Sequence, residues 1–359
     1  MADKRIVLIG TKRGLFVGTA PLKGGALKIS GPHLPGEHVN AAVLDQRGSG
    51  TPSLYVAANS WHWGASVNYS RNFGESWDRA KQQPRFKEGS KLAVSALWQL
   101  QTDGPDHPDC LYAGTDPAAL FRSSDRGETW VELTGLSNHE TREKWQPGAG
   151  GLCLHTILVD PVDSNHLTIG ISAVGVFESK DRGASWTLSN AGLPCVFEPN
   201  AIGAIGSCIH KLAYAPGQPA RLYQQNHVDV WRRDGDGPWT KITSNLPSNF
   251  GFPMVVHPRN RECAYVIPLK GGEYRAPIEG ELAVYRTLDA GATWTALKKG
   301  LPQPAHAGIL RDAFASDGAS GLYFGTNGGH LFTSDDEGEN WTTSAELLPP
   351  IYSVRAYLV

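Results

Sequence analysis

Several features that would narrow the function are missing from this sequence. The five cysteines are an odd number among 359 residues and form no dense framework, so a disulfide-rich secreted scaffold is not indicated. The apolar run at residues 5–10 is too short for a signal peptide, and no run approaches the length of a membrane helix. We therefore expect a cytoplasmic protein without a membrane partner.

Strong charge and nucleotide-binding motifs are absent as well. The formal net charge is −2, which gives no reason to expect a nucleic-acid partner. The sequence has no P-loop, no dinucleotide fingerprint and no serine nucleophile elbow, so the enzyme classes that depend on these motifs are not indicated.

The sequence does contain a repeated pattern, which can be written S/T-x-D-x-G-x-T/S-W. Its copies lie roughly 45 to 55 residues apart, and a fixed period of this size is typical of solenoids, propellers and arrays. The clear copies are Ser123–Trp130, Ser179–Trp186, Thr287–Trp294 and Ser334–Trp341, with an asparagine-containing copy at Ser70–Trp77 and a degraded one at Arg233–Trp239.

The residue types of the pattern predict a tight turn followed by a buried ring. Asp and Ser or Thr side chains can bond nearby backbone N–H groups and close a turn. Glycine supplies a positive φ, and the tryptophan then starts a strand and buries its ring between neighbouring sheets. These residues, Asp125 and Trp130 in the first clear copy, are therefore expected to be structural.

The pattern resembles the Asp-box, or BNR repeat, of sialidases, sortilin-type receptor domains, xyloglucanase-like glycoside hydrolases and a photosystem II assembly factor. All of these are β-propellers, so the resemblance implies an all-β fold. It implies less about function, because the family contains both enzymes and binding scaffolds.

Strand patterns between the boxes predict one propeller domain over residues 1–359 with seven four-stranded antiparallel blades. Six blades are complete, and the chain ends share the seventh, which closes the ring and removes exposed sheet edges. The expected blades are residues 36–80, 90–133, 151–190, 206–245, 250–298, 306–345, and 350–359 with 4–30, and the inner strand of the sixth is expected at residues 309–317.

Histidines recur near the start of the predicted inner strands. Two Cys-x-His pairs carry His155 and His210, and His38 occupies a comparable position. Because inner strands converge on the propeller axis, these three histidines could bind one divalent transition metal (Zn, Fe, Cu or Mn). The alternative is that they bond backbone carbonyls or channel waters.

The leading hypothesis is a hydrolase or lyase, with glycosides among its candidate substrates. A small polar substrate or glycan would bind in a histidine-rich pocket at the top of the channel, with or without a metal. The candidate catalytic residues are His155, His210, Asp312, Glu273 and Arg311. The candidate substrate-binding residues are Trp61, His62, Trp63, Asp116, His227, Tyr274, Arg275 and Arg355.

Three alternatives remain open at this stage. The chain could be a non-catalytic propeller that binds a protein or a glycan, and its oligomeric state is not determined by the sequence. Trp61-His62-Trp63 is either an aromatic platform for a sugar or a loop packed on a neighbouring blade.

Glycoside cleavage needs two carboxylates across a pocket, for which Asp116, Glu198, Glu273, Glu279 and Asp312 are candidates. Sialidase activity itself is not expected, because the family's arginine-Ile-Pro motif is absent and no spacing recommends Arg275, Arg311 and Arg355 as its arginine triad.

Overall fold

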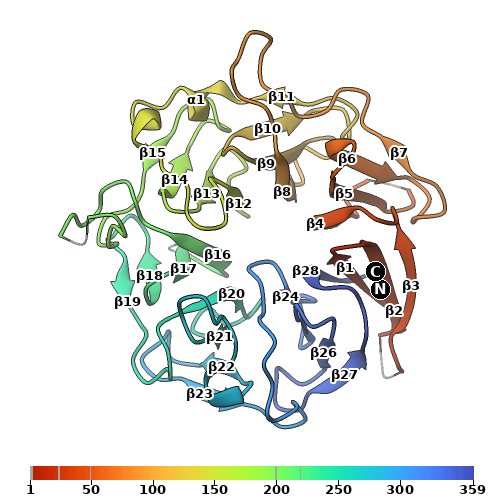
Figure 1. Cartoon of the computed structure of the whole chain (residues 1–359), viewed down its shortest axis with the longest axis vertical. Coiled ribbons are helices and arrows are strands. Elements are labelled where there is room, and N and C mark those ends of the chain that lie inside the picture. Colours follow the sequence, from red (N-terminus) through yellow and green to blue (C-terminus); the bar gives the residue numbers. More distant parts are fainter. Residues whose placement is uncertain (1–2, 23–24, 49, 199, 219) are drawn as a thin grey trace. The chain divides into compact units, whose positions relative to one another are not determined.

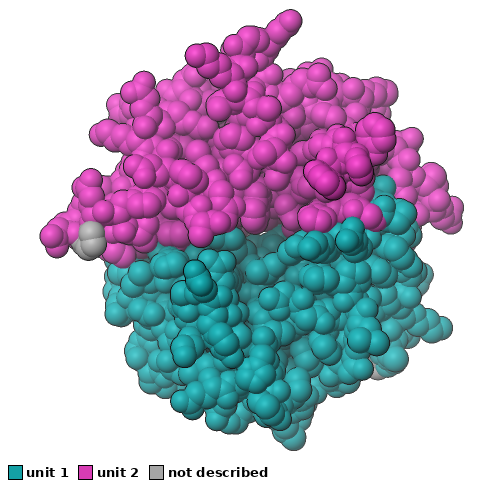
Figure 2. Space-filling view, in the orientation of Figure 1, with its two compact units in different colours: residues 1–35, 210–359 teal, residues 36–209 magenta. Residues whose placement is uncertain are grey.

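The computed structural model describes residues 3–22, 25–48, 50–198, 200–218 and 220–359. They divide into two compact units: unit 1 contains residues 1–35 and 210–359, and unit 2 contains residues 36–209 (Figure 2). Parts of three predicted blades, at residues 23–24, 49 and 219, lie outside the described residues. Each unit is described by itself below.

Unit 2 contains three four-stranded antiparallel sheets (Figure 1). Their strands are β4 (His38–Asp45), β5 (Ser53–Ser60), β6 (Gly64–Ser70) and β7 (Asp78–Arg79); β8 (Ala96–Thr102), β9 (Leu111–Asp116), β10 (Leu120–Ser123) and β11 (Val131–Glu132); and β12 (Leu154–Val159), β13 (Leu167–Ile171), β14 (Gly175–Ser179) and β15 (Thr187–Leu188).

Unit 1 contains four more four-stranded antiparallel sheets. One of them includes β16, whose first residue, Ile209, is the last residue of unit 2. Their strands are β28 (Ile351–Leu358), β1 (Lys4–Thr11), β2 (Gly14–Pro21) and β3 (Lys28–His33); β16 (Ile209–Ala215), β17 (Arg221–Asn226), β18 (Val230–Asp234) and β19 (Thr240–Lys241); β20 (Gly251–Val256), β21 (Ala264–Pro268), β22 (Val284–Thr287) and β23 (Thr295–Leu297); and β24 (Phe314–Ser316), β25 (Leu322–Gly325), β26 (Leu331–Ser334) and β27 (Thr342–Ala345).

The described residues thus form seven four-stranded blades, and the predicted seven-bladed β-propeller fold is confirmed. Helix is confined to short pieces, namely α1 (Thr134–Ser137) and the 3-10 turns η1 (Arg142–Lys144) and η2 (Ile278–Gly280). Among the described residues, no helix is both long and apolar enough to cross a membrane.

The two ends of the chain meet in one blade, as the sequence predicts. Strand β28 pairs antiparallel with β1, so that Arg5 lies opposite Leu358 and Ile9 lies opposite Val354. The backbone N–H of Lys4 also donates to the carbonyl of Val359 over 3.0 Å. One expected inner strand, residues 309–317, is much shorter than predicted, because only Phe314–Ser316 forms β24.

Each Asp-box joins the third and fourth strands of its blade, where its side chains replace a backbone turn. In the copy between β10 and β11, Asp125 Oδ1 accepts from the Ser123 hydroxyl over 2.8 Å and from the Thr129 N–H over 2.9 Å. The Ser123 hydroxyl oxygen in turn accepts from the Gly127 N–H over 2.8 Å. Asn72 keeps the corresponding contacts with Ser70 and Ser76, so the turn needs a short side-chain acceptor rather than a charge.

The turn contains two successive residues with positive φ, whereas the sequence indicated only the glycine. Arg126 has φ +61° and Gly127 has φ +84°. The same conformation is found at the residue before the box glycine in the other copies, namely Phe73, Arg182, Ala290 and Glu337. This conformation costs free energy in a residue with a side chain, and the hydrogen bonds of the box stabilise it.

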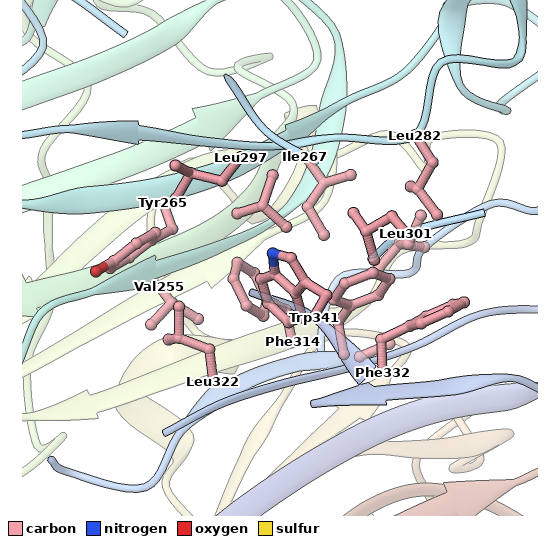
Figure 3. Close-up of a cluster of buried hydrophobic side chains, with 14 of the residues drawn as sticks. Val255, Tyr265, Ile267, Leu282, Leu297, Leu301, Phe314, Leu322, Phe332 and Trp341 are labelled. Atoms are coloured by element: carbon pink, nitrogen blue, oxygen red, sulfur yellow. The ribbon is translucent and has the colours of Figure 1, made fainter. Parts of the chain in front are cut away.

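The box tryptophans bury their rings between successive blades. Trp130 is 1% exposed and belongs to a core cluster with Tyr55 and Val67 of the preceding blade. Trp341 plays the same part between the last two full blades of unit 1, where it packs with Tyr265 and Leu322 (Figure 3). Full burial of one such ring contributes on the order of 3 kcal/mol, so each box orients a blade and also fills its interface.

We expect the box carboxylates to stabilise the fold in a pH-dependent way. Hydrogen bonds from Thr293, above all from its hydroxyl, lower the pKa of Asp289 to about 2. Asp289→Ala should lower the free energy of unfolding by about 1 kcal/mol near neutral pH, and Asp289→Asn by less. Because the folded pKa is depressed, the contribution is complete above the ordinary carboxyl pKa of about 3.9 and disappears as pH falls toward the folded value.

Denaturant unfolding of the two variants and the parent chain at a series of pH values measures this effect. The gap between the parent chain and Asp289→Ala should narrow on acidification. A gap that stays constant or widens on acidification would show that the carboxylate charge does not contribute to the turn.

Candidate functional site

The rings of four residues in unit 1 pack together and form what we call the His210 cluster, namely His210, His227, Phe250 and Phe252. The His210 ring stacks on Phe252 with centroids 4.6 Å apart and planes at 26°. His227 meets His210 edge to face at 5.5 Å and Phe250 at 5.2 Å. His210 and both phenylalanines are buried, whereas His227 is exposed. The cluster therefore offers one accessible imidazole on an apolar base.

A close approach between neighbouring strands positions His210. Its Nδ1–H donates to the carbonyl of Gly251 over 2.6 Å, which connects β16 to β20. A side chain at Gly251 would come within 2.9 Å of the Ile267 carbonyl and 3.1 Å of Gln225 Oε1, so glycine permits this approach. This hydrogen bond fixes the orientation of the His210 imidazole, with Nδ1 as the ring nitrogen that faces Gly251.

Two arginines extend the cluster. The Cζ atoms of Arg275 and Arg311 lie 5.6 and 5.3 Å from the centroid of Phe252. Arg275 comes from the long segment between β21 and β22, where Tyr274 also bonds His306 through its hydroxyl and Nδ1 over 3.1 Å. The predicted residues His210, His227, Tyr274, Arg275 and Arg311 are thus all found in this part of unit 1.

The charge of the surroundings affects His227. Partial burial lowers the pKa of His227, and the positive charges of Arg275 and Arg311 lower it further. The imidazole is therefore neutral at neutral pH, so it can accept or donate a single proton in a hydrogen bond.

The same cluster contains the best-placed potential metal ligands. Ring nitrogens of His210 and His227, both in unit 1, lie within 4.8 Å of each other. The predicted set of His38, His155 and His210 is a different one, and its first two members belong to unit 2. Metal binding stays a prediction.

Asp312, a predicted catalytic residue, is part of a buried ion network. Its carboxylate pairs with Lys211 through Oδ1 and with Arg355 through Oδ2, the latter over 3.0 Å. Its carbonyl also accepts from the Val354 N–H over 2.7 Å. Burial lowers the pKa of Lys211, while the Asp312 carboxylate opposes that effect. These contacts connect three parts of unit 1, namely β16, β28 and the segment that precedes β24. Asp312 and Arg355 therefore have a structural role.

His155 in unit 2 bonds a backbone carbonyl, which was the alternative to metal binding for the histidines. Its Nε2–H donates to the carbonyl of Ile209 over 2.9 Å, and its Nδ1 lies 3.0 Å from the Thr156 hydroxyl. The side chain is 3% exposed. Both ring nitrogens are therefore used inside unit 2, an arrangement suited to structure more than to ligand binding. His38 is half-buried at the start of β4.

The predicted carboxylates occupy separate environments. Asp116 is the last residue of β9, and partial burial raises the pKa of its carboxyl group. A side chain at Gly151 would collide with Asp116 Oδ2, so glycine lets the following loop pass close to the carboxyl group. Glu273 is exposed and lies with Asp312 in unit 1.

Trp61 and Trp63 form an exposed aromatic tip between β5 and β6. They are 94% and 74% exposed, so the alternative of a loop packed on a neighbouring blade is wrong. The Ser60 hydroxyl accepts from the N–H groups of His62 and Trp63 over 3.2 and 3.1 Å, which fixes the turn. The rings of Trp61 and His62 lie 5.5 Å apart at 33°. The tip is thus an ordered aromatic surface directed to solvent.

A groove of about 560 Å³ adjoins this tip within unit 2. Trp63, Arg79, Arg85, Phe86 and Leu92 are among the residues that line it. Arg79 also donates to the Trp63 carbonyl over 3.3 Å. Sequence reasoning found the tryptophans but missed the groove and the two arginines, because the segment of residues 80–95 carries no motif.

Comparisons with known proteins agree with this fold. Residues 120–133 match the model of the BNR-Asp box repeat family. A xyloglucanase from Paenibacillus sp is 26% identical over 266 residues, which are 66% of this chain and 24% of that protein. This chain therefore spans about a quarter of the length of that relative.

Solved structures give the same result at lower identity. The GH74 xyloglucanase from Xanthomonas campestris has a TM-score of 0.62 and 19% identity, covering 100% of this chain and 52% of the other. YCF48 from Cyanidioschyzon merolae has a TM-score of 0.52 and 13% identity, covering 86% and 84%. At these identities the likeness shows the fold alone.

The ion network around Asp312 should contribute to stability. Asp312→Asn keeps the shape of the side chain but leaves Lys211 buried beside a neutral amide, so we expect a loss of about 3 kcal/mol in the free energy of unfolding. Glu281→Gln is the matched control, because the Glu281 carboxylate pairs with Lys298 over 3.6 Å, both side chains are more than half exposed, and such pairs contribute less than about 1 kcal/mol. Chemical denaturation compares the two, and equal losses would contradict the structural role of Asp312.

Proposed function

We propose that this chain is a carbohydrate-directed propeller of the glycoside-hydrolase type, with Trp61 and Trp63 as its sugar-contact surface. The observation that carries the proposal is the pair of ordered, solvent-directed indoles beside an open groove. Large exposed aromatic rings are rare on soluble proteins unless they bind a partner. We choose a carbohydrate as that partner because similar proteins are xyloglucanases.

The groove has the composition that a sugar chain requires. Flat indole faces offer apolar contact to the C–H faces of pyranose rings, and Arg79 and Arg85 offer hydrogen-bond donors to hydroxyl groups. Because the Ser60 hydroxyl and Arg79 already fix the tip, binding would cost little conformational entropy there.

We expect the tryptophans to dominate binding. Trp61→Ala and Trp63→Ala should each weaken binding of a xyloglucan oligosaccharide by about 30-fold, because a ligand-stacked tryptophan typically contributes about 2 kcal/mol. Val162→Ala is a matched control, since Val162 is a 75% exposed apolar residue elsewhere on unit 2. Isothermal titration calorimetry measures the affinities.

The proposal predicts intact affinity in the control and lost affinity in both tryptophan variants. Binding that is insensitive to both substitutions would exclude the tip as the contact surface. A wild-type chain that does not bind the oligosaccharide would contradict the carbohydrate assignment.

Glycoside hydrolysis uses a general acid together with a second carboxylate, and Asp116 is the residue we assign as the general acid. Its pKa is raised by burial, as general acids need. Ser95, which follows the groove residue Val94, donates its N–H and its hydroxyl to the Asp116 carbonyl, both over 2.8 Å. These bonds connect the backbone of Asp116 to the residue that follows the groove lining.

Asp116→Asn should reduce the release of reducing ends from xyloglucan oligosaccharides by about 100-fold in kcat, with oligosaccharide affinity nearly unchanged. A reducing-sugar assay together with calorimetry separates the two effects. Unchanged release by the variant would remove Asp116 from the mechanism. Binding without any release by the parent chain would make the protein a glycan-binding scaffold instead.

A further inference from the structure

Positive charge is concentrated beside the His210 cluster. Arg275 and Arg311 both bring their guanidinium groups to within 6 Å of the centroid of Phe252, and Lys270 lies 5.7 Å from the ring of Tyr274 on the same segment. The rings of Phe250 and Phe252 are about 95% buried behind these cations. An apolar backing of this kind lowers the local dielectric constant and strengthens every electrostatic interaction at the site.

The backbone holds Arg275 in place. Lys270 and Arg275 close a loop, since the Lys270 N–H donates to the Ala276 carbonyl over 2.9 Å and the Arg275 N–H donates to the Lys270 carbonyl over 3.1 Å. Arg275 has φ +47°, a left-handed conformation that is unfavourable for a residue with a side chain. A side chain at Gly308 would come within 2.6 Å of the Arg275 carbonyl, so glycine lets the segment leading to Arg311 pack against it.

The nearby carboxylates compensate this charge only in part. Asp312 follows Arg311 in the chain, but its two oxygens pair with Lys211 and Arg355. Glu273 is exposed on the segment of Arg275. Arg275 and Arg311 both lie over the ring of Phe252, which stacks on His210, and His210 meets His227 edge to face. The position beside His227 is therefore electropositive.

We propose that unit 1 binds an oxyanion, a carboxylate or phosphate group of a small ligand, between Arg275, Arg311 and His227. The Nε–H of Arg275 already donates to the Gly272 carbonyl over 3.2 Å. The two terminal nitrogens of Arg275 are therefore the ones that would contact the ligand. Guanidinium groups match the geometry of carboxylates and phosphates with paired N–H donors. This site is separate from the tryptophan tip and does not depend on the carbohydrate proposal.

An anion is favoured here over a metal cation. The two guanidinium groups over the ring of Phe252 repel any cation at the neighbouring imidazoles, and the repulsion is stronger for a divalent ion than for a single charge. Binding of an anion has the opposite effect, because a negative group beside an imidazole stabilises its protonated form. The two ligands therefore predict opposite shifts of the pKa of His227.

The test uses three probes built on the same hexose ring: D-glucuronate, D-glucose 6-phosphate and neutral D-glucose. Calorimetry near neutral pH should detect one or both anions and little glucose, and the stronger of the two identifies the oxyanion. Arg275→Gln and Arg311→Gln should each weaken the anion by about tenfold or more, since each removes charge-assisted hydrogen bonds. Arg311→Lys, which keeps the charge, should weaken it less.

Arg259→Gln is the matched control, because Arg259 is an exposed arginine elsewhere in unit 1. It should bind like the parent chain. NMR titration of the His227 ring should show a higher pKa with the bound anion, a change that a merely structural role for the arginines does not produce.

Equal affinity for glucose and the anions, equal weakening by the control, or no anion binding would each overturn the proposal. So would stoichiometric Zn²⁺ binding that tightens when Arg275 is neutralised.

Discussion

The fold depends on one local interaction, the capture of backbone N–H groups by a short side chain in each Asp-box. In the copy at residues 123–130, one carboxylate oxygen accepts from both a hydroxyl and a backbone N–H, while the first serine accepts from the glycine N–H. These bonds hold two residues at positive φ and direct the tryptophan into the interface with the preceding blade. Turn geometry and blade packing are therefore set by the same few side chains.

Within each unit, the residues that stabilise the fold differ from those of the candidate ligand surfaces. The box residues are engaged in turns or cores, and the buried ions around Asp312 connect strands. The two candidate ligand surfaces lie on connections between strands: the aromatic tip on the short turn between β5 and β6, and the segment around Arg275 between β21 and β22. One surface presents indole faces and the other presents the guanidinium groups of Arg275 and Arg311, so the two suit chemically different ligands.

Much of the fold could be read from the sequence because its signals are local. The boxes marked the turn between third and fourth strands, and the alternating strands between them gave seven blades with a shared terminal blade. The short β24 was overestimated, because residues 309–313 have strand-like composition but lie outside β24. The second positive φ of each box was missed, since Arg126 and its equivalents have no residue type that predicts it.

The sites were harder to predict, because they depend on contacts between residues distant in sequence. His155 and His210 occupy similar Cys-x-His pairs, yet one bonds its neighbours through both ring nitrogens and the other stacks on Phe252 beside His227. Arg275 and Arg311 approach the same ring only because Gly308 allows close backbone contact, which no spacing reveals. Both histidines are buried, at 3% and 2% exposed, so the neighbouring side chains decided the outcome rather than burial or residue type.

The central claim is that the aromatic tip and its groove contact a carbohydrate. Hydrogen–deuterium exchange with and without a xyloglucan oligosaccharide tests it most directly, because it maps binding along the whole chain. The account predicts slower exchange at residues 60–64 and 79–94, with residues 270–276 unchanged. Protection confined to residues 270–276, or none anywhere, would contradict it.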